Sequence, residues 1–286
     1  MFLKKKKILI TGGSGFIGKR LISFLKNKNV EVFAIENKNK VFIKKSNKIS
    51  CSLIDKDEIL EFIKLKNPDT LIHLGWYGIP DFSKRNNLIN FKQQISFLKI
   101  IKKTNIKKIF ISGSCLEYGD SQGRVTESKK NNNLNSFAIY KNKIRQFCKK
   151  LFVNKQLIWG RIFYAYGKGQ RNVSLINSII KKKYIYLKDP YKYCDFIHVD
   201  DVCSAIYSLI NSRLNGIFNI SNNLPVLIID FCKKIKFLYR DKKIIIKVNK
   251  FSKLNGNWGN NQKLISIGWK PKFQLMNGIK NTLNHK

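Results

Sequence analysis

The sequence predicts an α/β fold, in which a doubly wound parallel sheet carries a smaller mixed lobe at its C-terminal end. Three observations support this prediction. Short apolar runs alternate with amphipathic stretches over residues 1–163, the connections between them are short, and a glycine-rich turn follows the first apolar run. Strands that alternate with helices in this way form a parallel sheet covered on both faces, because each connection crosses over the sheet.

The first part of the chain contains every element of such a sheet in order. The helix pattern is clearest over Phe16–Lys26, where Ile17, Leu21, Ile22 and Leu25 fall on one face. The predicted strands are the short apolar runs Lys7–Thr11, Val30–Ile35, Ile49–Ile54, Asp69–Leu74, Lys108–Ser112 and Leu157–Ile162. The predicted helices are Phe16–Lys26, Ile59–Leu65, Asn87–Lys103 and Phe137–Phe152.

The pattern is looser after residue 163. We expect a first domain over residues 1–163 and a smaller lobe over residues 164–286, with residues 196–220 returning to the first domain. A polar, Asn-rich loop over Asp120–Asn135 is expected at the surface near the site. The elements predicted in the second part are Val173–Lys182, Phe196–Val199, Val202–Asn211, Gly216–Ile220, Asp230–Tyr239 and Ile244–Val248.

The net charge of +39 does not by itself indicate a nucleic-acid partner. Arg occurs eight times, so 48 of the 56 basic residues are Lys, and Lys, Asn, Ile and Phe share A- and T-rich codons. A biased genome therefore explains the charge, since phosphate-reading proteins favour clustered Arg. We expect no nucleic-acid partner, and an RNA- or polyanion-binding role remains an alternative supported by charge alone.

The composition also indicates in which cellular compartment the protein is expected. With 43% hydrophobic residues the chain can bury a core, but no run approaches the roughly 20 apolar residues of a membrane helix. Only Ile8–Ile10 separates the first lysines from Thr11, which is too short for a secretory signal. The six Cys form no CxxC pair, and only three His are present, so we expect reduced thiols and no metal site. A cytoplasmic protein without membrane contact is predicted.

The glycine-rich turn predicts a dinucleotide cofactor. Gly12 permits a tight turn after the first strand, Gly15 permits close approach to a pyrophosphate, and Gly18 permits close helix–strand packing. Ser14, Phe16 and Ile17 complete the turn, and the helix N-terminus attracts phosphate. Glu36, at the end of the second strand, is placed to accept bonds from the adenosine ribose. It favours NAD over NADP, although Lys38 and Lys40 lie close to it in sequence.

Several separate segments resemble motifs of the extended short-chain dehydrogenase/reductase family, the nucleotide-sugar epimerases, dehydratases and reductases. Thr11–Gly18 resembles TGxxGFIG, and His73–Trp76 resembles the HLAA-type stretch. Ser112–Gly119 resembles SSxxVYG, and Asp195–Asp201 resembles RDFIHVDD. Arg161–Gly167 and Gly268–Pro271 are also similar to family segments. The resemblance implies a Rossmann-type NAD(P)-binding domain, a substrate-binding lobe for a nucleotide-diphosphate sugar, and a role in polysaccharide precursor synthesis.

The resemblance also implies roles for individual residues. Ser114 matches the catalytic Ser/Thr, and Lys141 matches the catalytic Lys, which also holds the nicotinamide ribose. The further cofactor contacts implied are Leu74, Gly75, Trp76, Asn90, Ser112 and Tyr164, and the substrate contacts are Ser114, Tyr77, Tyr166 and Arg171. Relatives often form homodimers through two long helices, here Asn87–Lys103 and Phe137–Phe152, although such Lys-rich helices can equally stay solvated.

The catalytic tyrosine of the family is missing. In the family's Tyr-x-x-x-Lys pair the Lys lowers the Tyr pKa, but the position four residues before Lys141 is Phe137. Three explanations remain open: Tyr140, a water or another group transfers the proton, the reaction needs no tyrosine, or activity is weakened or lost. The last would make the chain a non-catalytic cofactor-binding relative.

Other departures from the family motifs limit which reaction of the family we expect. Cys194 stands where the family often has an Arg that contacts the substrate diphosphate, and Arg171, Lys168 or one of Lys181–Lys183 could supply that positive charge instead. Ser52 stands where the family often has an Asp after the third strand. Dehydratases carry an Asp-Glu pair directly after the catalytic Ser/Thr, but here Cys115 and Leu116 follow Ser114. The segment is more similar to 4-keto-6-deoxyhexose reductases, the relatives of CDP-abequose synthase. A nucleotide-sugar 4-epimerase is the alternative within the family.

Overall fold

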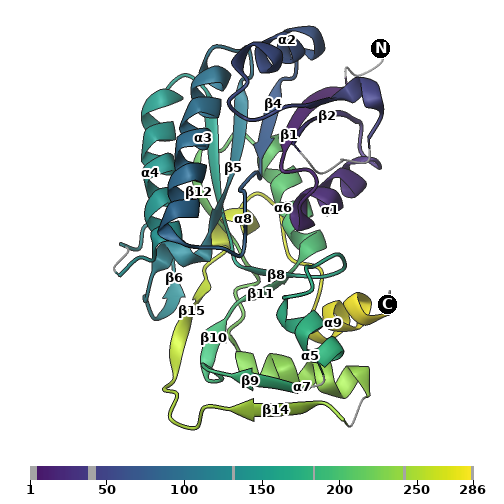
Figure 1. Cartoon of the computed structure of the whole chain (residues 1–286), viewed down its shortest axis with the longest axis vertical. Helices are drawn as coiled ribbons and strands as arrows, with labels where there is room; N and C mark the ends of the chain where they lie inside the picture. Colours follow the sequence, from purple (N-terminus) through teal and green to yellow (C-terminus); the bar gives the residue numbers. More distant parts are fainter. Residues whose placement is uncertain (1–4, 38–42, 131–132, 183, 241–242, 285–286) are drawn as a thin grey trace.

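A seven-stranded parallel sheet forms the larger part of the molecule in the computed structural model, which describes residues 5–37, 43–130, 133–182, 184–240 and 243–284 (Figure 1). The strand order is β12-β7-β5-β4-β1-β2-β3, and every neighbouring pair is parallel. This order is that of a doubly wound Rossmann sheet, so the predicted fold class is confirmed. The strands are β1 (Lys6–Thr11), β2 (Val30–Glu36), β3 (Lys48–Ser50), β4 (Thr70–His73), β5 (Lys108–Ser114), β7 (Gln156–Ile162) and β12 (Gly216–Ile220).

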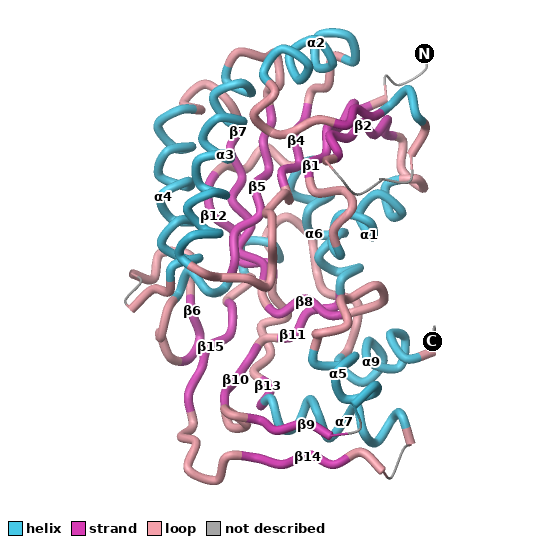
Figure 2. Tube along the Cα trace, in the orientation of Figure 1, coloured by secondary structure: helices cyan, strands magenta, loops and turns pink. Residues whose placement is uncertain are grey.

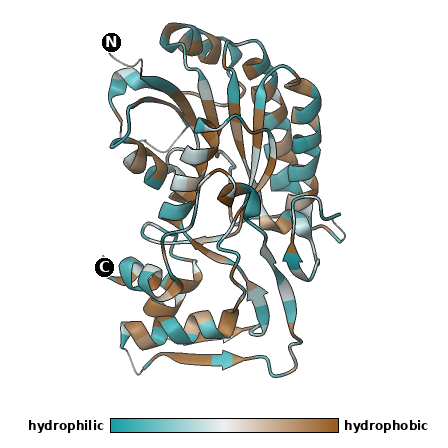
Figure 3. Cartoon of the chain, turned by 180° about the vertical axis from the view of Figure 1, so that it is seen from behind, coloured by the Kyte–Doolittle hydropathy of each residue, from teal (hydrophilic) through white to brown (hydrophobic). Residues whose placement is uncertain are grey.

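Helices cover both faces of this sheet (Figures 1 and 2). The helices α1 (Phe16–Leu25) and α6 (Val199–Asn211) pack together on one face. On the other face lie α2 (Lys56–Lys66), α3 (Lys84–Lys102) and α4 (Ser136–Leu151), with α3 against α4. Because both faces are covered, the middle of the central strand β1 is apolar on both sides, and Ile8, Leu9 and Ile10 are fully buried. Figure 3 shows this apolar character along the sheet.

The smaller part of the molecule is a mixed lobe. Its four-stranded sheet has the order β13-β10-β15-β6, and two parallel pairs join β8 to β11 and β9 to β14. These strands are β6 (Gly123–Val125), β8 (Tyr164–Tyr166), β9 (Tyr184–Leu187), β10 (Lys192–Cys194), β11 (Phe196–His198), β13 (Val226–Leu227), β14 (Ile245–Val248) and β15 (Asn255–Gly259). The helices α5 (Leu175–Lys182), α7 (Ile228–Tyr239) and α9 (Leu275–Leu283) pack beside them.

The chain crosses between the two parts more than once. After β11 it returns as α6 and β12 to the large domain, and the short helix α8 (Gln262–Ile265) contacts β12. The strand β6, from the first part of the sequence, pairs with β15 in the small sheet. The division at residue 163 therefore stays a prediction. Within the residues described, no helix has both the length and the apolar character needed to span a bilayer.

Three local differences from the predicted elements have clear causes. β3 ends at Ser50, short of the predicted Ile54, because the Asp55 carboxylate accepts a bond from the Ser52 N–H and closes a turn before α2. α6 begins three residues before the predicted Val202, because the His198 side chain accepts a bond from the Asp200 N–H. The predicted surface loop over Asp120–Asn135 contains β6, whose Val125 is fully buried.

Candidate active site

The glycine-rich turn forms a tight cradle between β1 and α1. Gly12 has φ +72°, and a Cβ there would lie 2.7 Å from the backbone of Leu74 and Gly75. A Cβ on Gly18 would lie 2.2 Å from the Gly12 carbonyl oxygen, so the helix packs directly on the turn. The Gly15 N–H donates to that same carbonyl at 3.0 Å. Gly15 is the exposed N-cap of α1 and offers no side-chain cap, which leaves the helix N-terminus open to an anion.

The loop after β4 is held against this cradle by buried polar side chains. The His73 ring contacts Thr11 Oγ1 at 2.5 Å through Nδ1, and its Nε2 contacts Gln94 of α3. Gln94 in turn donates to the Gly75 carbonyl. Burial lowers the pKa of His73 to about 4, so the ring is neutral at physiological pH. These bonds fix Leu74, Gly75 and Trp76, the backbone stretch predicted to line a cofactor.

Asn90 has a positioning role. Its side-chain carbonyl accepts a bond from the Tyr77 N–H at 2.7 Å, and its amide donates to the Tyr77 carbonyl at 2.9 Å and to Asn86. The side chain is 1% exposed. Asn90 therefore holds the backbone beyond Trp76, while the Tyr77 side chain is exposed at the rim.

Glu36 ends β2 as predicted, and it is largely buried. Its carboxylate pairs with Lys48 of β3 at 3.2 Å. Lys38 and Lys40 lie outside the described residues. The acid is therefore placed at the carboxyl edge of the sheet, one strand away from the glycine cradle, where a dinucleotide ribose lies in this fold.

Lys141 and Phe137 lie beside Ser112 at the end of β5. The Lys141 ammonium donates to the Ser112 carbonyl at 2.9 Å and lies 4.3 Å above the Trp76 ring centroid. The Phe137 ring meets Trp76 edge-on, with centroids 5.0 Å apart. Burial lowers the pKa of Lys141 to about 8. Ser114, two residues beyond Ser112, is half-buried and accepts a bond from the Leu116 N–H.

Tyr140 is not part of this cluster. Its ring packs against Phe91 of α3, with centroids 5.4 Å apart, and Lys143 lies over it at 5.5 Å. Three residues along a helix leave Tyr140 only about 60° from Phe137, but its ring contact with Phe91 shows that Tyr140 lies in the packing between α3 and α4. The structure therefore does not bring Tyr140 to the position of the missing tyrosine.

Tyr164 and Tyr166, both predicted to line the site, lie in different surroundings. The Tyr164 hydroxyl is hydrogen-bonded to Cys194 and lies near Cys115, and burial raises its pKa well above the ordinary value. Tyr164 therefore lies beside the Ser114 segment. Tyr166 is instead buried in the lobe, where its hydroxyl reaches the Leu275 carbonyl at 3.5 Å. The exposed Arg171 donates to the Ile79 carbonyl, in the loop that follows Tyr77.

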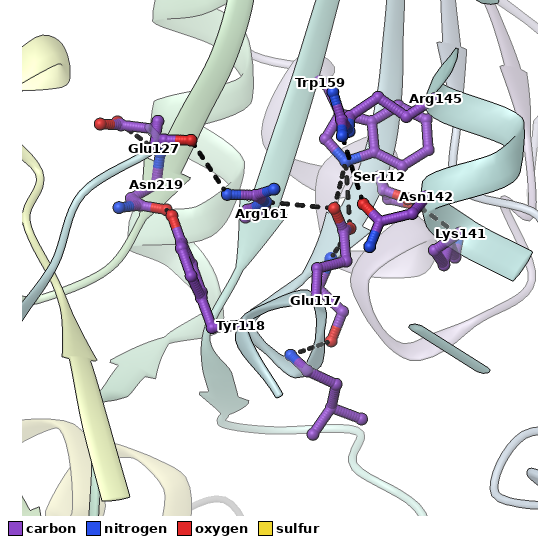
Figure 4. Close-up of polar contacts among 12 residues, drawn as sticks. Ser112, Glu117, Tyr118, Glu127, Lys141, Asn142, Arg145, Trp159, Arg161 and Asn219 are labelled. Carbon is purple, nitrogen blue, oxygen red and sulfur yellow. Dashed lines mark hydrogen bonds and ion pairs between the residues drawn. The ribbon is translucent and has the colours of Figure 1, made fainter. Parts of the chain in front are cut away.

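A buried ion pair between Glu117 and Arg161 lies next to the Ser114 segment, and the sequence motifs did not predict it. The fully buried Glu117 carboxylate contacts Arg161 Nε at 3.1 Å and Trp159 Nε1 at 3.0 Å, and accepts the Ser114 N–H at 2.8 Å (Figure 4). Glu117 therefore points away from the substrate side of Ser114. The pattern that could have revealed the pair is a lone acid after the serine and a lone Arg within the next apolar strand.

A group of three possible metal ligands, Cys51, Asp55 and Glu58, lies near the end of β3. Burial and the two carboxylates raise the pKa of the Cys51 thiol to about 12, which opposes the thiolate that a metal needs. Asp55 is already bonded to the Ser52 N–H. All six cysteines are buried and form no disulfide.

The fold and this site define a dinucleotide-binding protein of the Rossmann class. The N-terminus of α1 carries no side-chain cap, and the Trp76 Nε1 is buried with no partner among the described residues, so the residues present fit a nicotinamide dinucleotide. The chain belongs to the NAD dependent epimerase/dehydratase family, whose model matches residues 8–221. These enzymes are the extended short-chain dehydrogenases/reductases, so the predicted family is confirmed.

Individual relatives are distant. The chain is 26% identical over 230 residues to a dTDP-6-deoxy-L-talose 4-dehydrogenase (NAD(+)) from Aggregatibacter actinomycetemcomitans, covering 76% of this chain and 85% of that one. Its structure resembles a UDP-glucose 4-epimerase with UDP-glucose from Thermotoga maritima, with TM-score 0.86, 21% identity and 98% coverage of both chains. It also resembles MoeE5 in complex with UDP-glucose and NAD, with TM-score 0.85, 18% identity and 97% coverage of both chains. These structural likenesses show the fold.

Proposed function

We propose that the protein is an NAD-dependent 4-ketoreductase of a nucleotide-linked 6-deoxyhexose. The observation that carries the proposal is the arrangement around Ser114. Lys141 donates to the carbonyl of Ser112, two residues before Ser114. Cys115 and Leu116 follow Ser114, so no carboxylate directly follows the serine, and the Glu117 carboxylate is bonded to Arg161 and to the Ser114 N–H. Elimination of water needs such a carboxylate, whereas reduction of a ketone does not. The 4-dehydrogenase among the relatives catalyses chemistry of this class.

The cofactor contacts follow from the cradle. The open N-terminus of α1 would hold the pyrophosphate, and Glu36 would accept bonds from the adenosine ribose, which favours NAD over NADP. When bound, the nicotinamide supplies or takes up the hydride. The Ser114 hydroxyl would donate to the sugar C4 oxygen, while the Lys141 ammonium holds positive charge beside it.

A cation for the substrate diphosphate is available on β10. Lys192 and Cys194 point to the same face of this strand, because side chains alternate along it. Burial raises the pKa of the Cys115 and Cys194 thiols, and the positive charge of Lys192 opposes this rise at both, which supports a position of Lys192 near the Ser114 segment. Lys192 is therefore a stronger candidate than Lys181, which donates to Asn172 at 2.7 Å. Exchange of Lys192 for Ala should raise the substrate KM about tenfold and leave the NADH Kd unchanged.

The proposal includes a homodimer through α3 and α4. These helices pack together along one side of the molecule (Figure 1), and they carry the exposed apolar side chains Leu88, Ile89 and Ile139. Light scattering should give twice the mass of the 33.4 kDa chain. A monomer whose mass is unchanged by Ile139→Lys would remove this part of the proposal.

Oxidation of NADH in the presence of nucleotide-linked 4-keto-6-deoxyhexoses tests the reaction. The expected result is loss of reduced-nicotinamide absorbance with at least one member of a CDP-, dTDP- and GDP-linked panel, which also tests the resemblance to the CDP-abequose synthase group. A protein that interconverts UDP-linked hexose C4 epimers without net NADH loss would be a 4-epimerase instead. A protein that binds NADH but changes no substrate would be a non-catalytic relative.

A further inference from the structure

We propose that the Lys141 ammonium is itself the acid that protonates the substrate oxygen, in place of the missing tyrosine. The inference rests on the proposed ketoreductase function. Lys141 is buried at the site, and its Nζ donates one hydrogen to the Ser112 carbonyl. Among the described residues no other hydrogen-bond acceptor contacts Nζ, although an ammonium has three hydrogens to donate. The remaining hydrogens are therefore available to a ligand.

The aromatic neighbours of Lys141 shape its surroundings. Trp76 lies against one side of the ammonium at 4.3 Å, and Phe137 lies at 5.7 Å. These rings stabilise the cation through their faces but accept no proton. The Phe82 ring, 4.9 Å from that of Phe137, extends this apolar surface. The ammonium is consequently held in one place without being neutralised.

The other protonated groups of the site are poor donors. Tyr140 faces α3, as described above. The Tyr164 hydroxyl is bonded to Cys194, and its pKa lies well above the ordinary value. Burial raises the pKa of the Cys115 thiol to about 12. Lys141 differs from all of these because burial moves its pKa downward, to about 8, which suits an acid working near neutral pH.

The titratable groups around Lys141 lie on η2, β4, β7 and α4. The negative charge of Glu117 in η2 (Cys115–Tyr118) opposes the lowering of the Lys141 pKa by burial, but its carboxylate is already bonded to Arg161 of β7. From β4, His73 is neutral, and on α4 itself the Cys148 thiol is buried with its pKa raised to about 12. Arg145, one turn along α4, is cationic. No carboxylate contacts the ammonium directly among the described residues, so desolvation remains the dominant influence on its pKa.

In the proposed reaction Lys141 gives one proton to the substrate oxygen. In reduction, the hydride from the bound cofactor forms the new C–H bond at the sugar carbon, and the carbonyl π electrons move to oxygen. One Lys141 Nζ–H bond breaks as the O–H bond of the alcohol forms, and the ammonium becomes a neutral amine. The amine regains a proton from solvent after product release. In the oxidative direction, the neutral amine takes the proton from the alcohol.

Three proteins test this role: the unchanged chain, Lys141→Arg and Phe137→Tyr. Arg keeps the positive charge but does not release a proton near neutral pH. Lys141→Arg should therefore lower kcat at least about 100-fold while the NADH Kd changes less than about threefold. For the unchanged chain, kcat should fall as the pH rises through about 8. In Phe137→Tyr the pH at which kcat falls should shift. A Lys141→Arg variant with kcat within about tenfold of the unchanged chain would overturn the proposal.

A spectroscopic titration needs no substrate. The protein is labelled with ¹³C at lysine Cε, and the Lys141 resonance is the one lost in Lys141→Arg. Its midpoint should lie near 8, whereas a midpoint above 10 would contradict the proposal. Lys143→Arg serves as the matched control, because Lys143 lies two residues further along α4 and over the Tyr140 ring, and this variant should keep both kcat and the Lys141 resonance. If the unchanged chain reduces no substrate, the proposed function fails; if it does and Lys141→Arg is equally active, only the role of Lys141 fails.

Discussion

The Phe137 and Trp76 rings form a T-shaped pair, with the two centroids 5.0 Å apart and the rings inclined at 77°. This contact occupies the position where relatives are expected to carry a catalytic hydroxyl. It replaces a proton donor with an apolar wall, yet Lys141 stays in place with its bond to Ser112. Under the proposed function, the site therefore works without the tyrosine hydroxyl and with the Lys141 charge beside the glycine-rich turn and its neighbouring loop.

Glu36 should decide the cofactor preference. Glu36→Ala removes the acceptor for the ribose hydroxyls and the charge that repels a 2′-phosphate, so the NAD Kd should rise about tenfold, or ~1.4 kcal/mol. Affinity for NADP should rise relative to NAD. Fluorescence titration with NADH and NADPH measures both. Glu31→Ala, at the opposite end of β2, is the control and should change neither affinity; equal losses in the two variants would exclude a specific role for Glu36.

Gly12 should be intolerant of any side chain. Gly12→Ala combines a positive φ with a Cβ 2.7 Å from the Gly75 nitrogen, so we expect a loss of at least about 3 kcal/mol in the free energy of unfolding. Gly268 has φ +80° but nothing within 4 Å of its Cβ position. Gly268→Ala should therefore cost only about 1–2 kcal/mol. Urea unfolding of both variants makes the comparison, and equal losses would show that the cradle is not tightly packed.

The Glu117–Arg161 pair should be essential for stability. Glu117→Gln leaves the Arg161 charge buried without its partner, which should cost about 3–5 kcal/mol. The partly exposed pair of Arg20 and Asp200 provides the contrast, since Arg20→Gln should cost less than about 1 kcal/mol. Denaturant unfolding of the two single variants and of Glu117→Gln/Arg161→Gln measures this. A fully additive double variant would contradict direct coupling.

His73 should make the protein sensitive to acid. Its pKa is about 4 in the folded chain, below its ordinary value of 6.5, so between these values the unfolded chain binds more protons. Stability should therefore be complete above pH 6.5 and fall by about 3 kcal/mol as the pH decreases to about 4. Comparison of urea unfolding across this range with His73→Gln isolates the contribution. A His73→Gln variant with the same acid loss would assign the loss to other groups.

Local features of the site were predictable from the sequence. The turn from Gly12 to Gly18 depends on residues within one strand–helix junction, and the structure reproduces the tight packing expected of Gly12 and Gly18. Glu36 was likewise placed by its position at the end of a single predicted strand, whereas Lys141 was assigned by its match to a family motif. Such positions depend on backbone periodicity, which the sequence contains.

Features that depend on distant pairing were not predictable. β10 has only three residues, and its parallel partner β15 begins at Asn255, far along the chain. Neither segment shows strand periodicity on its own. The direction of Tyr140 similarly depends on Phe91 of α3, and the burial of Tyr166 depends on α9, where a Cβ on Gly278 would touch its hydroxyl. Tertiary packing determined these positions.

Transfer of deuterium tests the central claim most directly. NADH deuterated at nicotinamide C4 is incubated with the protein and a nucleotide-linked 4-keto-6-deoxyhexose, and the product is examined by mass spectrometry and NMR. We expect one deuteron per molecule at sugar C4 in the unchanged chain. A protein that binds both compounds but yields no deuterated sugar would contradict a ketoreductase that works without the tyrosine.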